Sequence, residues 1–119
     1  MKLIPLKDCI NKNLYNMYQN IPKEELGSFN KMNGVSYEEF KDICKEYIKE
    51  ETIKNEKIDT TTNRYILVDN DCLIGEIGIR TTLNDFWINK GSQIFYKIRL
   101  DKRGKGYGNE ILRLALEEA

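Results

Sequence analysis

One short run of residues has the composition of a phosphate-binding loop, and it reads Arg103-Gly104-Lys105-Gly106-Tyr107-Gly108. It follows an apolar, strand-like segment, Ile94 to Leu100, and opens a helical pattern from Tyr107 to Ala119. Glycines allow consecutive backbone amides to turn toward one concavity, and a helix that begins there adds the positive end of its dipole. The sequence therefore predicts an anion site whose ligand is a phosphate or a pyrophosphate.

Two common phosphate-binding loops do not fit this run. The nucleoside-triphosphate loop requires Gly-x-x-x-x-Gly-Lys followed by Ser or Thr, but Gly104-Lys105 is followed by Gly106, and Arg99 replaces the first glycine. The dinucleotide fingerprint fails because Asn109 stands where its third glycine belongs. The pattern that fits is Arg-x-x-Gly-x-Gly, and an ordinary strand-to-helix turn is the competing interpretation.

The pattern Arg103-x-x-Gly106-x-Gly108, preceded by Ile98-x-Leu100, resembles the acyl-CoA-binding motif of the GNAT N-acetyltransferase superfamily. The likeness covers roughly residues 64 to 119 and is to a bacterial branch of predicted acetyltransferases. Four further segments carry it, namely Ile74-Gly75-Glu76-Ile77-Gly78-Ile79-Arg80, Leu83-Asn84, Gly91-Ser92-Gln93-Ile94 and Tyr96-Lys97-Ile98-Arg99.

The resemblance implies acetyl-CoA as the acetyl donor and direct transfer to an amine of an unknown acceptor, either a small molecule or a peptide. No metal takes part in this chemistry. The backbone from Gly104 to Gly108 would hold the pyrophosphate, and Arg103 would place a cation beside it. Ile98, Arg99 and Leu100 would offer backbone groups to the pantetheine arm.

Acetyl transfer needs a base that takes a proton from the attacking ammonium and an acid that returns one to the departing thiolate. Glu76 is the first candidate for the base because it is the only carboxylate within either central strand, and the alternative interpretation is a solvated or paired strand residue. Tyr96 is a candidate polar group in the site. The resemblance supplies no acid, because the family's usual tyrosine belongs to a C-terminal part that no segment here matches.

Length and composition favour one small domain over residues 1–119, because 119 residues leave no room for a second core. The chain is 40% hydrophobic and 32% charged, and no apolar run approaches the roughly 20 residues that span a bilayer. The start, Met1 to Leu6, is too short and too soon polar for a secretory signal. We therefore expect no membrane partner and a cytoplasmic location.

Cysteine, histidine and charge exclude other classes of function. Cys9, Cys44 and Cys72 are widely spaced, which suits packing in a reducing compartment, and the absence of histidine leaves no usual metal site. The net charge of zero argues against a nucleic-acid partner. A local RNA-binding patch is the weaker alternative, since five basic residues accompany one aspartate between positions 97 and 105: Lys97, Arg99, Lys102, Arg103 and Lys105.

Hydrophobic periodicity predicts the element order βααβββα. The expected strands are Lys2 to Leu6, Tyr65 to Val68, Leu73 to Ile79 and Ser92 to Leu100, and the expected helices are Lys7 to Asn20, Ser36 to about Glu51 and Tyr107 to Ala119. Ser36 and Glu39 form a capping box for the second helix, and Asp69-Asn70-Asp71 turns a hairpin. Residues 27–34, 60–63 and 81–91 are predicted connections.

This order predicts an α+β fold in three layers, with a mixed sheet covered by helices on both faces. It matches the first two thirds of the GNAT fold, whose C-terminal strands and helix are missing, so we expect a truncated chain. A homodimer would then cover the open edge of the fourth strand. The alternative to an active enzyme is a non-catalytic CoA-binding or oligomerising domain.

Overall fold

Residues 1–25, 28–49, 60–82 and 92–118 are described by the computed structural model. Within them, four strands form one sheet in the order β1-β4-β5-β6. The strands are β1 (Lys2–Pro5), β4 (Thr60–Asp69), β5 (Cys72–Thr82) and β6 (Ser92–Ile98). A second, two-stranded sheet pairs β2 (Glu24–Glu25) with β3 (Ser28–Phe29). Short 3-10 turns, η1 (Leu6–Asp8) and η3 (Leu100–Lys102), follow β1 and β6.

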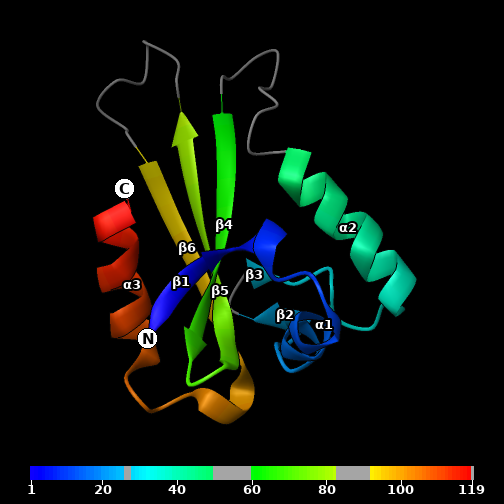
Figure 1. Cartoon of the computed structure of the whole chain (residues 1–119), viewed down its shortest axis with the longest axis horizontal. Helices are drawn as coiled ribbons and strands as arrows, with labels where there is room; N and C mark the ends of the chain where they lie inside the picture. The colour runs from blue at the N-terminus through cyan, green and yellow to red at the C-terminus, as the bar shows by residue number, and fades with distance from the viewer. Residues whose placement is uncertain (26–27, 50–59, 83–91, 119) are drawn as a thin grey trace.

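Helices cover both faces of the four-stranded sheet. Helix α3 (Tyr107–Glu118) packs on one face, while α1 (Lys12–Gln19) and α2 (Tyr37–Lys49) pack on the other (Figure 1). The α+β class is therefore confirmed. All described strand pairs are antiparallel, so the mixed sheet that we expected is not seen in this part of the chain. The outer edge of β6 has no partner strand among the described residues, and the homodimer stays a prediction.

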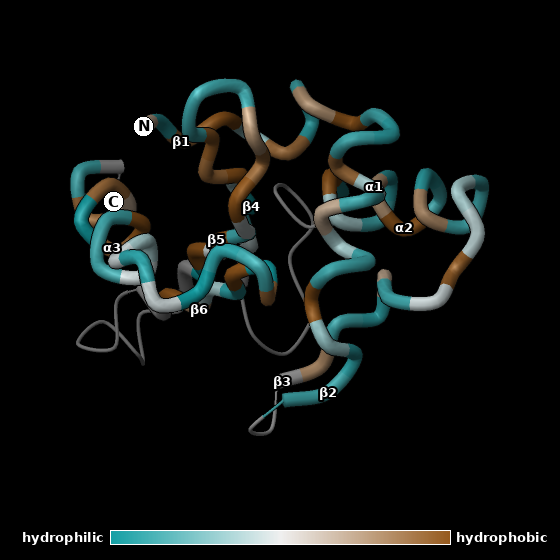
Figure 2. Tube along the Cα trace, turned by 90° about the horizontal axis from the view of Figure 1, so that it is seen from below, coloured by the Kyte–Doolittle hydropathy of each residue, from teal (hydrophilic) through white to brown (hydrophobic). Residues whose placement is uncertain are grey.

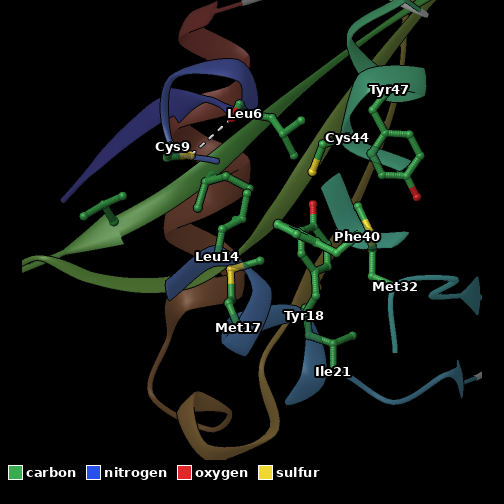
Figure 3. Close-up of a cluster of buried hydrophobic side chains, with 12 residues drawn as sticks. Leu6, Cys9, Leu14, Met17, Tyr18, Ile21, Met32, Phe40, Cys44 and Tyr47 are labelled. Atoms are coloured by element: carbon green, nitrogen blue, oxygen red, sulfur yellow. Dashed lines mark hydrogen bonds between the residues drawn. The ribbon is translucent and has the colours of Figure 1, made fainter. Parts of the chain in front are cut away.

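Alternate residues of β4 supply the two hydrophobic cores. Ile66 and Val68 join the core with α1 and α2, and Leu67 between them joins the core with α3. Figure 2 shows the strands lying between these two helical layers. In the larger core, Tyr18 of α1 lies against Phe40 of α2, with ring centroids 6.2 Å apart (Figure 3). The period of two along β4 thus lets one strand anchor both layers.

A bulge in β5 decides which residues face each layer. Leu67 of β4 pairs with Gly75, whereas Val68 pairs with Leu73, so Ile74 is an extra residue in β5. The carbonyl of this extra residue accepts a hydrogen bond from the backbone amide of Arg99 at 3.1 Å. The bulge therefore fixes the end of β6, from which the predicted phosphate loop continues.

The N-terminal cap predicted for α2 is confirmed. The amide of Glu39 donates to Ser36 Oγ at 3.2 Å, and that hydroxyl donates to Glu39 Oε1 at 3.4 Å. The single helix predicted from Lys7 is wrong. Residues 6–8 form a 3-10 turn, and α1 begins only at Lys12, because Asn11 is extended and accepts the amide of Leu14 at 3.0 Å.

The hairpin between β4 and β5 is confirmed, and its strands are longer than expected. Asn70 and Asp71 occupy the two turn positions with φ of 50° and 63°, as a type I′ turn requires. The prediction that residues 60–63 form a polar linker is wrong, because Thr60 pairs with Thr82 and the pairing continues to Asn63 with Ile79. The expected end of the second helix at Glu51 and most of the 81–91 connection lie outside the described residues.

Candidate functional site

The predicted phosphate loop borders a cavity of about 300 Å³. One wall is the segment after α1 together with the end of β2, from which Ile21, Pro22 and Glu25 line the cavity. The other wall comes from β6, η3 and the start of α3, and its lining residues are Tyr96, Lys97, Ile98, Lys102, Arg103, Gly104, Gly106, Tyr107 and Gly108. Because side chains alternate faces along a strand, three consecutive lining residues of β6 place the cavity along its edge.

Glycine is required at two positions of the loop by backbone conformation. Gly104 and Gly106 have φ of +78° and +83°, and a Cβ at either position would meet no atom within 4 Å. From Gly104 onward, the first backbone amide that donates a hydrogen bond to a preceding carbonyl is that of Glu110, which donates to Gly106 at 3.3 Å. The amides from Gly104 to Asn109 donate to no residue that the structure describes. The cavity is thus bordered by unused donors at a helix start, an arrangement that favours anions.

Arg103 joins the two walls of the cavity. Its Nε donates to the carbonyl of Ile98 at 3.0 Å, and its guanidinium NH1 donates to Glu25 Oε2 at 2.5 Å. The hydrogen bond from Arg103 lowers the pKa of Glu25 below its ordinary value. The cation that we expected beside a phosphate therefore does border the cavity, but a carboxylate of the chain already holds it.

Lys97 forms a second link between β6 and the small sheet. Its Nζ donates to the carbonyl of Phe29 at 2.7 Å. Burial lowers the pKa of Lys97, and the nearby Glu76 carboxylate opposes this shift. With Lys102 and Arg103, Lys97 gives the cavity three basic side chains against the one carboxylate of Glu25, so the lining is net positive.

Two tyrosines line the cavity in different ways. The Tyr96 side chain is 43% exposed, and its hydroxyl lies 3.5 Å from the point that a Cβ on Gly108 would occupy. Tyr107 donates its hydroxyl hydrogen to Asp69 Oδ2 at 2.7 Å, which raises the pKa of Tyr107 and ties the start of α3 to the β4–β5 turn. Of the two phenols, Tyr96 is the one without a described hydrogen-bond partner.

Three other predicted binding residues do not line the cavity. The amide of Arg99 donates to Ile74, and its side chain bonds Asp101 Oδ1 at 2.6 Å. The amide of Leu100 donates to the carbonyl of Asn20 at 2.9 Å. Lys105 is exposed outside the cavity. In this structure the amides of Arg99 and Leu100 are therefore engaged within the chain, and Ile98 alone of the expected pantetheine-binding segment borders the cavity.

Glu76, the predicted base, is enclosed on the α1–α2 side of the sheet. Its side chain is 3% exposed and lies 3.0 Å from Arg64 Nε, and the Arg64 guanidinium sits 3.6 Å from the centre of the Tyr47 ring. Glu76 pairs across the strands with Lys97, whereas Tyr96 pairs with Ile77. The two predicted catalytic residues are therefore not brought together, and only Tyr96 borders the cavity.

Glu25 is the site residue that sequence reasoning missed. It is the single carboxylate among the described residues that line the cavity, and it stands 78 positions before its partner Arg103. The wall that carries it is fixed by Asn30, whose buried Nδ2 donates to the carbonyls of Tyr18 and Ile21 at 2.9 and 3.0 Å. No local sequence pattern predicts the contact between Glu25 and Arg103, since glutamate and arginine are both ordinary surface residue types.

No group of three or more His, Cys, Asp or Glu side chains in residues 1–25, 28–49, 60–82 and 92–118 is placed to hold a metal ion. In the same ranges, no helix has the length and apolar character needed to cross a bilayer. Comparison of the chain with protein-family models, curated proteins and solved structures finds no match.

Proposed function

We propose that the chain is an acetyl-CoA-dependent N-acetyltransferase that binds the pyrophosphate of its donor at the loop from Arg103 to Gly108. One observation carries the proposal: this loop presents unused backbone amides and a helix start to a cavity whose lining has three basic side chains. An anion with several charged oxygens is the ligand that such a lining favours. The motif's resemblance to the GNAT superfamily selects acetyl-CoA among pyrophosphate ligands.

The size and position of the cavity fit part of this donor. About 300 Å³ is at the lower end of small-molecule sites, and it holds a diphosphate group rather than a whole CoA molecule. The remainder of the ligand would lie along the outer edge of β6, beside Tyr96 and Ile98. An extended amide-bearing arm can pair with a free strand edge, as peptides do in β-augmentation.

The chemistry proposed is direct transfer. The lone pair of a neutral amine attacks the thioester carbonyl carbon, the new C–N bond forms, and the C–S bond breaks. The amine loses a proton, and the departing thiolate takes one. The hydroxyl of the exposed Tyr96 is our candidate to give its proton to the thiolate, and the phenolate that results then takes the proton that the amine loses. We assign Glu76 a structural role, because it is buried in an ion pair outside the cavity.

A second candidate, a CoA-binding domain without turnover, is favoured by a different observation. Glu25 is the one described carboxylate in the cavity lining, and its hydrogen bond to Arg103 holds its pKa low. A carboxylate with a lowered pKa is a weak base for an ammonium group. The cavity therefore offers a binding site without an evident proton acceptor among its described residues.

Calorimetric titration of the 119-residue chain with acetyl-CoA tests the proposal, with dephospho-CoA and inorganic pyrophosphate as controls. Saturable binding of all three would assign affinity to the shared diphosphate. The bound chain is then incubated with a panel of amines and peptides, and acetylated products are sought by mass spectrometry. Product establishes the transferase, binding without product establishes the second candidate, and no binding leaves the loop as an ordinary turn.

A further inference from the structure

The ion pair between Glu25 and Arg103 bears on how an anion enters the proposed site. Both residues line the cavity, and their side chains are 40% and 34% exposed, so the pair lies at its mouth rather than within the core. The same guanidinium is held on its other side by the carbonyl of Ile98 at 3.0 Å. Arg103 is thus held in the cavity wall by two acceptors, the Ile98 carbonyl at Nε and the Glu25 carboxylate at NH1.

We propose that the Glu25 carboxylate competes with the bound anion for Arg103 and so sets which anions the site selects. This inference rests on the proposed function. A carboxylate and a phosphate present similar oxygen acceptors to a guanidinium, so the two cannot both take the same N–H groups of Arg103. Because Glu25 holds NH1, an incoming phosphate that binds this nitrogen displaces Glu25 from it. A pyrophosphate, with more charge and more acceptors, displaces it more readily than a monoanion such as acetate.

Displacement also affects the small sheet that carries Glu25. The β2–β3 pair is tied to β6 and its loop by two cations, Arg103 through Glu25 and Lys97 through the carbonyl of Phe29. The amide of Asn30 donates to the carbonyl of Lys23 at 2.7 Å and closes the same hairpin. When an anion takes NH1 of Arg103, the contact with Glu25 is lost and one of these two links breaks, so ligand binding and the anchoring of β2 are coupled.

The neighbouring residue provides a matched control. Glu24 belongs to the same short strand and carries the same charge, but it does not line the cavity. Glu25→Gln and Glu24→Gln therefore remove equal charge from nearly the same place. Only the first removes the competitor, so a general electrostatic effect and displacement give different results.

Titration of the full chain with inorganic pyrophosphate at low ionic strength separates the outcomes. Glu25→Gln should bind pyrophosphate about fivefold more tightly than the wild type, because a half-exposed ion pair no longer opposes binding. The affinity of Glu24→Gln should rise less than about twofold, since it changes only a screened surface charge. In an Arg103→Ala background, Glu25→Gln should give no gain beyond that of Glu24→Gln. Amide exchange at Asn30 should accelerate when wild-type protein is saturated.

Equal affinity of Glu25→Gln and the wild type would overturn the competitor role while leaving the anion site in place. Equal gains from Glu25→Gln and Glu24→Gln would overturn it as well, in favour of a general charge effect. If neither the wild type nor any variant bound pyrophosphate or acetyl-CoA, the proposed function would fail, and the inference with it.

Discussion

Glu76 and Tyr96 lie on opposite faces of the sheet, although they belong to neighbouring strands. Tyr96 pairs with Ile77, the residue next to Glu76, and adjacent residues of a strand point in opposite directions. The Glu76 side chain lies in the layer with α1 and α2, and the Tyr96 hydroxyl lies beside the start of α3, 3.5 Å from the point that a Cβ on Gly108 would occupy. The fold therefore places the two side chains in different layers, and each residue has its own expected phenotype.

Glu76→Gln should lower stability strongly. It removes the charge that neutralises the Arg64 guanidinium in a site where both side chains are nearly enclosed, 3% and 10% exposed. Breaking such a buried pair from one side costs about 3–5 kcal/mol. Urea unfolding measures the loss. Glu46→Gln is the control, because its pair with Lys31 is exposed and is worth at most about 1 kcal/mol. Equal effects of the two variants would contradict a structural role for Glu76.

Arg103→Ala should weaken acetyl-CoA binding by about 1.5–3 kcal/mol, because a charge-assisted contact to phosphate is lost. Lys105→Ala removes the same charge from the same loop at an exposed position outside the cavity. It should change the affinity less than about threefold, since screened surface charges act weakly. Calorimetry compares the two variants. Unchanged affinity in Arg103→Ala would remove this side chain from the site.

Gly106→Ala should destabilise the fold by about 1–2 kcal/mol, the cost of placing a side chain in the left-handed region. The φ of Gly106 is +83°, and nothing lies within 4 Å of the added Cβ, so the effect is conformational rather than steric. Gly108→Ala is the control within helix α3, where its Cβ would make ordinary contact with Tyr96. That variant should be neutral or stabilised by up to about 1 kcal/mol. Thermal unfolding distinguishes them.

Stability should fall as the pH rises above 9. Burial raises the pKa of Cys9 to about 11 and that of Cys44 to about 12, from an ordinary value of 9.0. Between pH 9 and 11 the unfolded chain has therefore released thiol protons that the folded chain retains, so stability is lost with rising pH. Each thiol adds a slope approaching about 1.4 kcal/mol per pH unit.

Cys44→Ala tests this pH dependence, since it should be less stable at pH 8 but show a shallower decline above pH 9. At neutral pH, thiol reagents should modify the partly exposed Cys72 of the folded protein well before the buried Cys9 and Cys44. A slope unchanged by Cys44→Ala, together with rapid labelling of all three thiols, would contradict the enclosed setting of these cysteines.

Asn30→Ala should destabilise the protein by about 2–3 kcal/mol, because it removes a buried amide group that donates to the carbonyls of Tyr18 and Ile21 and accepts from the backbone amide of Met32. Asn20→Ala is the control, since its side chain makes one exposed hydrogen bond to Asn16. Its cost should stay below about 1 kcal/mol. Because Ile21 lines the cavity, Asn30→Ala should also weaken acetyl-CoA binding, measured well below its unfolding temperature.

Signals that act within a few residues were sufficient to predict several elements. The cap at Ser36 and the turn at Asn70 and Asp71 depend on local hydrogen bonding and local φ, and both are confirmed. The prediction of a linker at Thr60, Thr61 and Thr62 is wrong because a polar β-branched run forms a strand only when a partner strand is available. Here the partner is the far end of β5, which tertiary pairing supplies.

In the candidate site too, the residues set by local conformation are predicted from the sequence, and those set by distant contacts are not. The sequence predicts the turn at Gly104 and Gly106 because a backbone position with positive φ strongly favours glycine. The sequence does not show whether a charged residue is buried, so it left both a base and a paired residue open for Glu76 and did not predict Arg64 as its partner. Glu25 was missed for a related reason, since its role arises from a contact with a residue 78 positions later.

That separation also sets when the cavity can form during synthesis. The wall with Ile21, Pro22 and Glu25 leaves the ribosome first, and its counterpart around Arg103 is translated 78 residues afterwards. At typical rates of 5–20 residues per second, this delay is about 4–16 s. The early wall must stay exposed for that time, which is long compared with the formation of helices and hairpins. The cavity therefore assembles later than the local elements that carry its first wall.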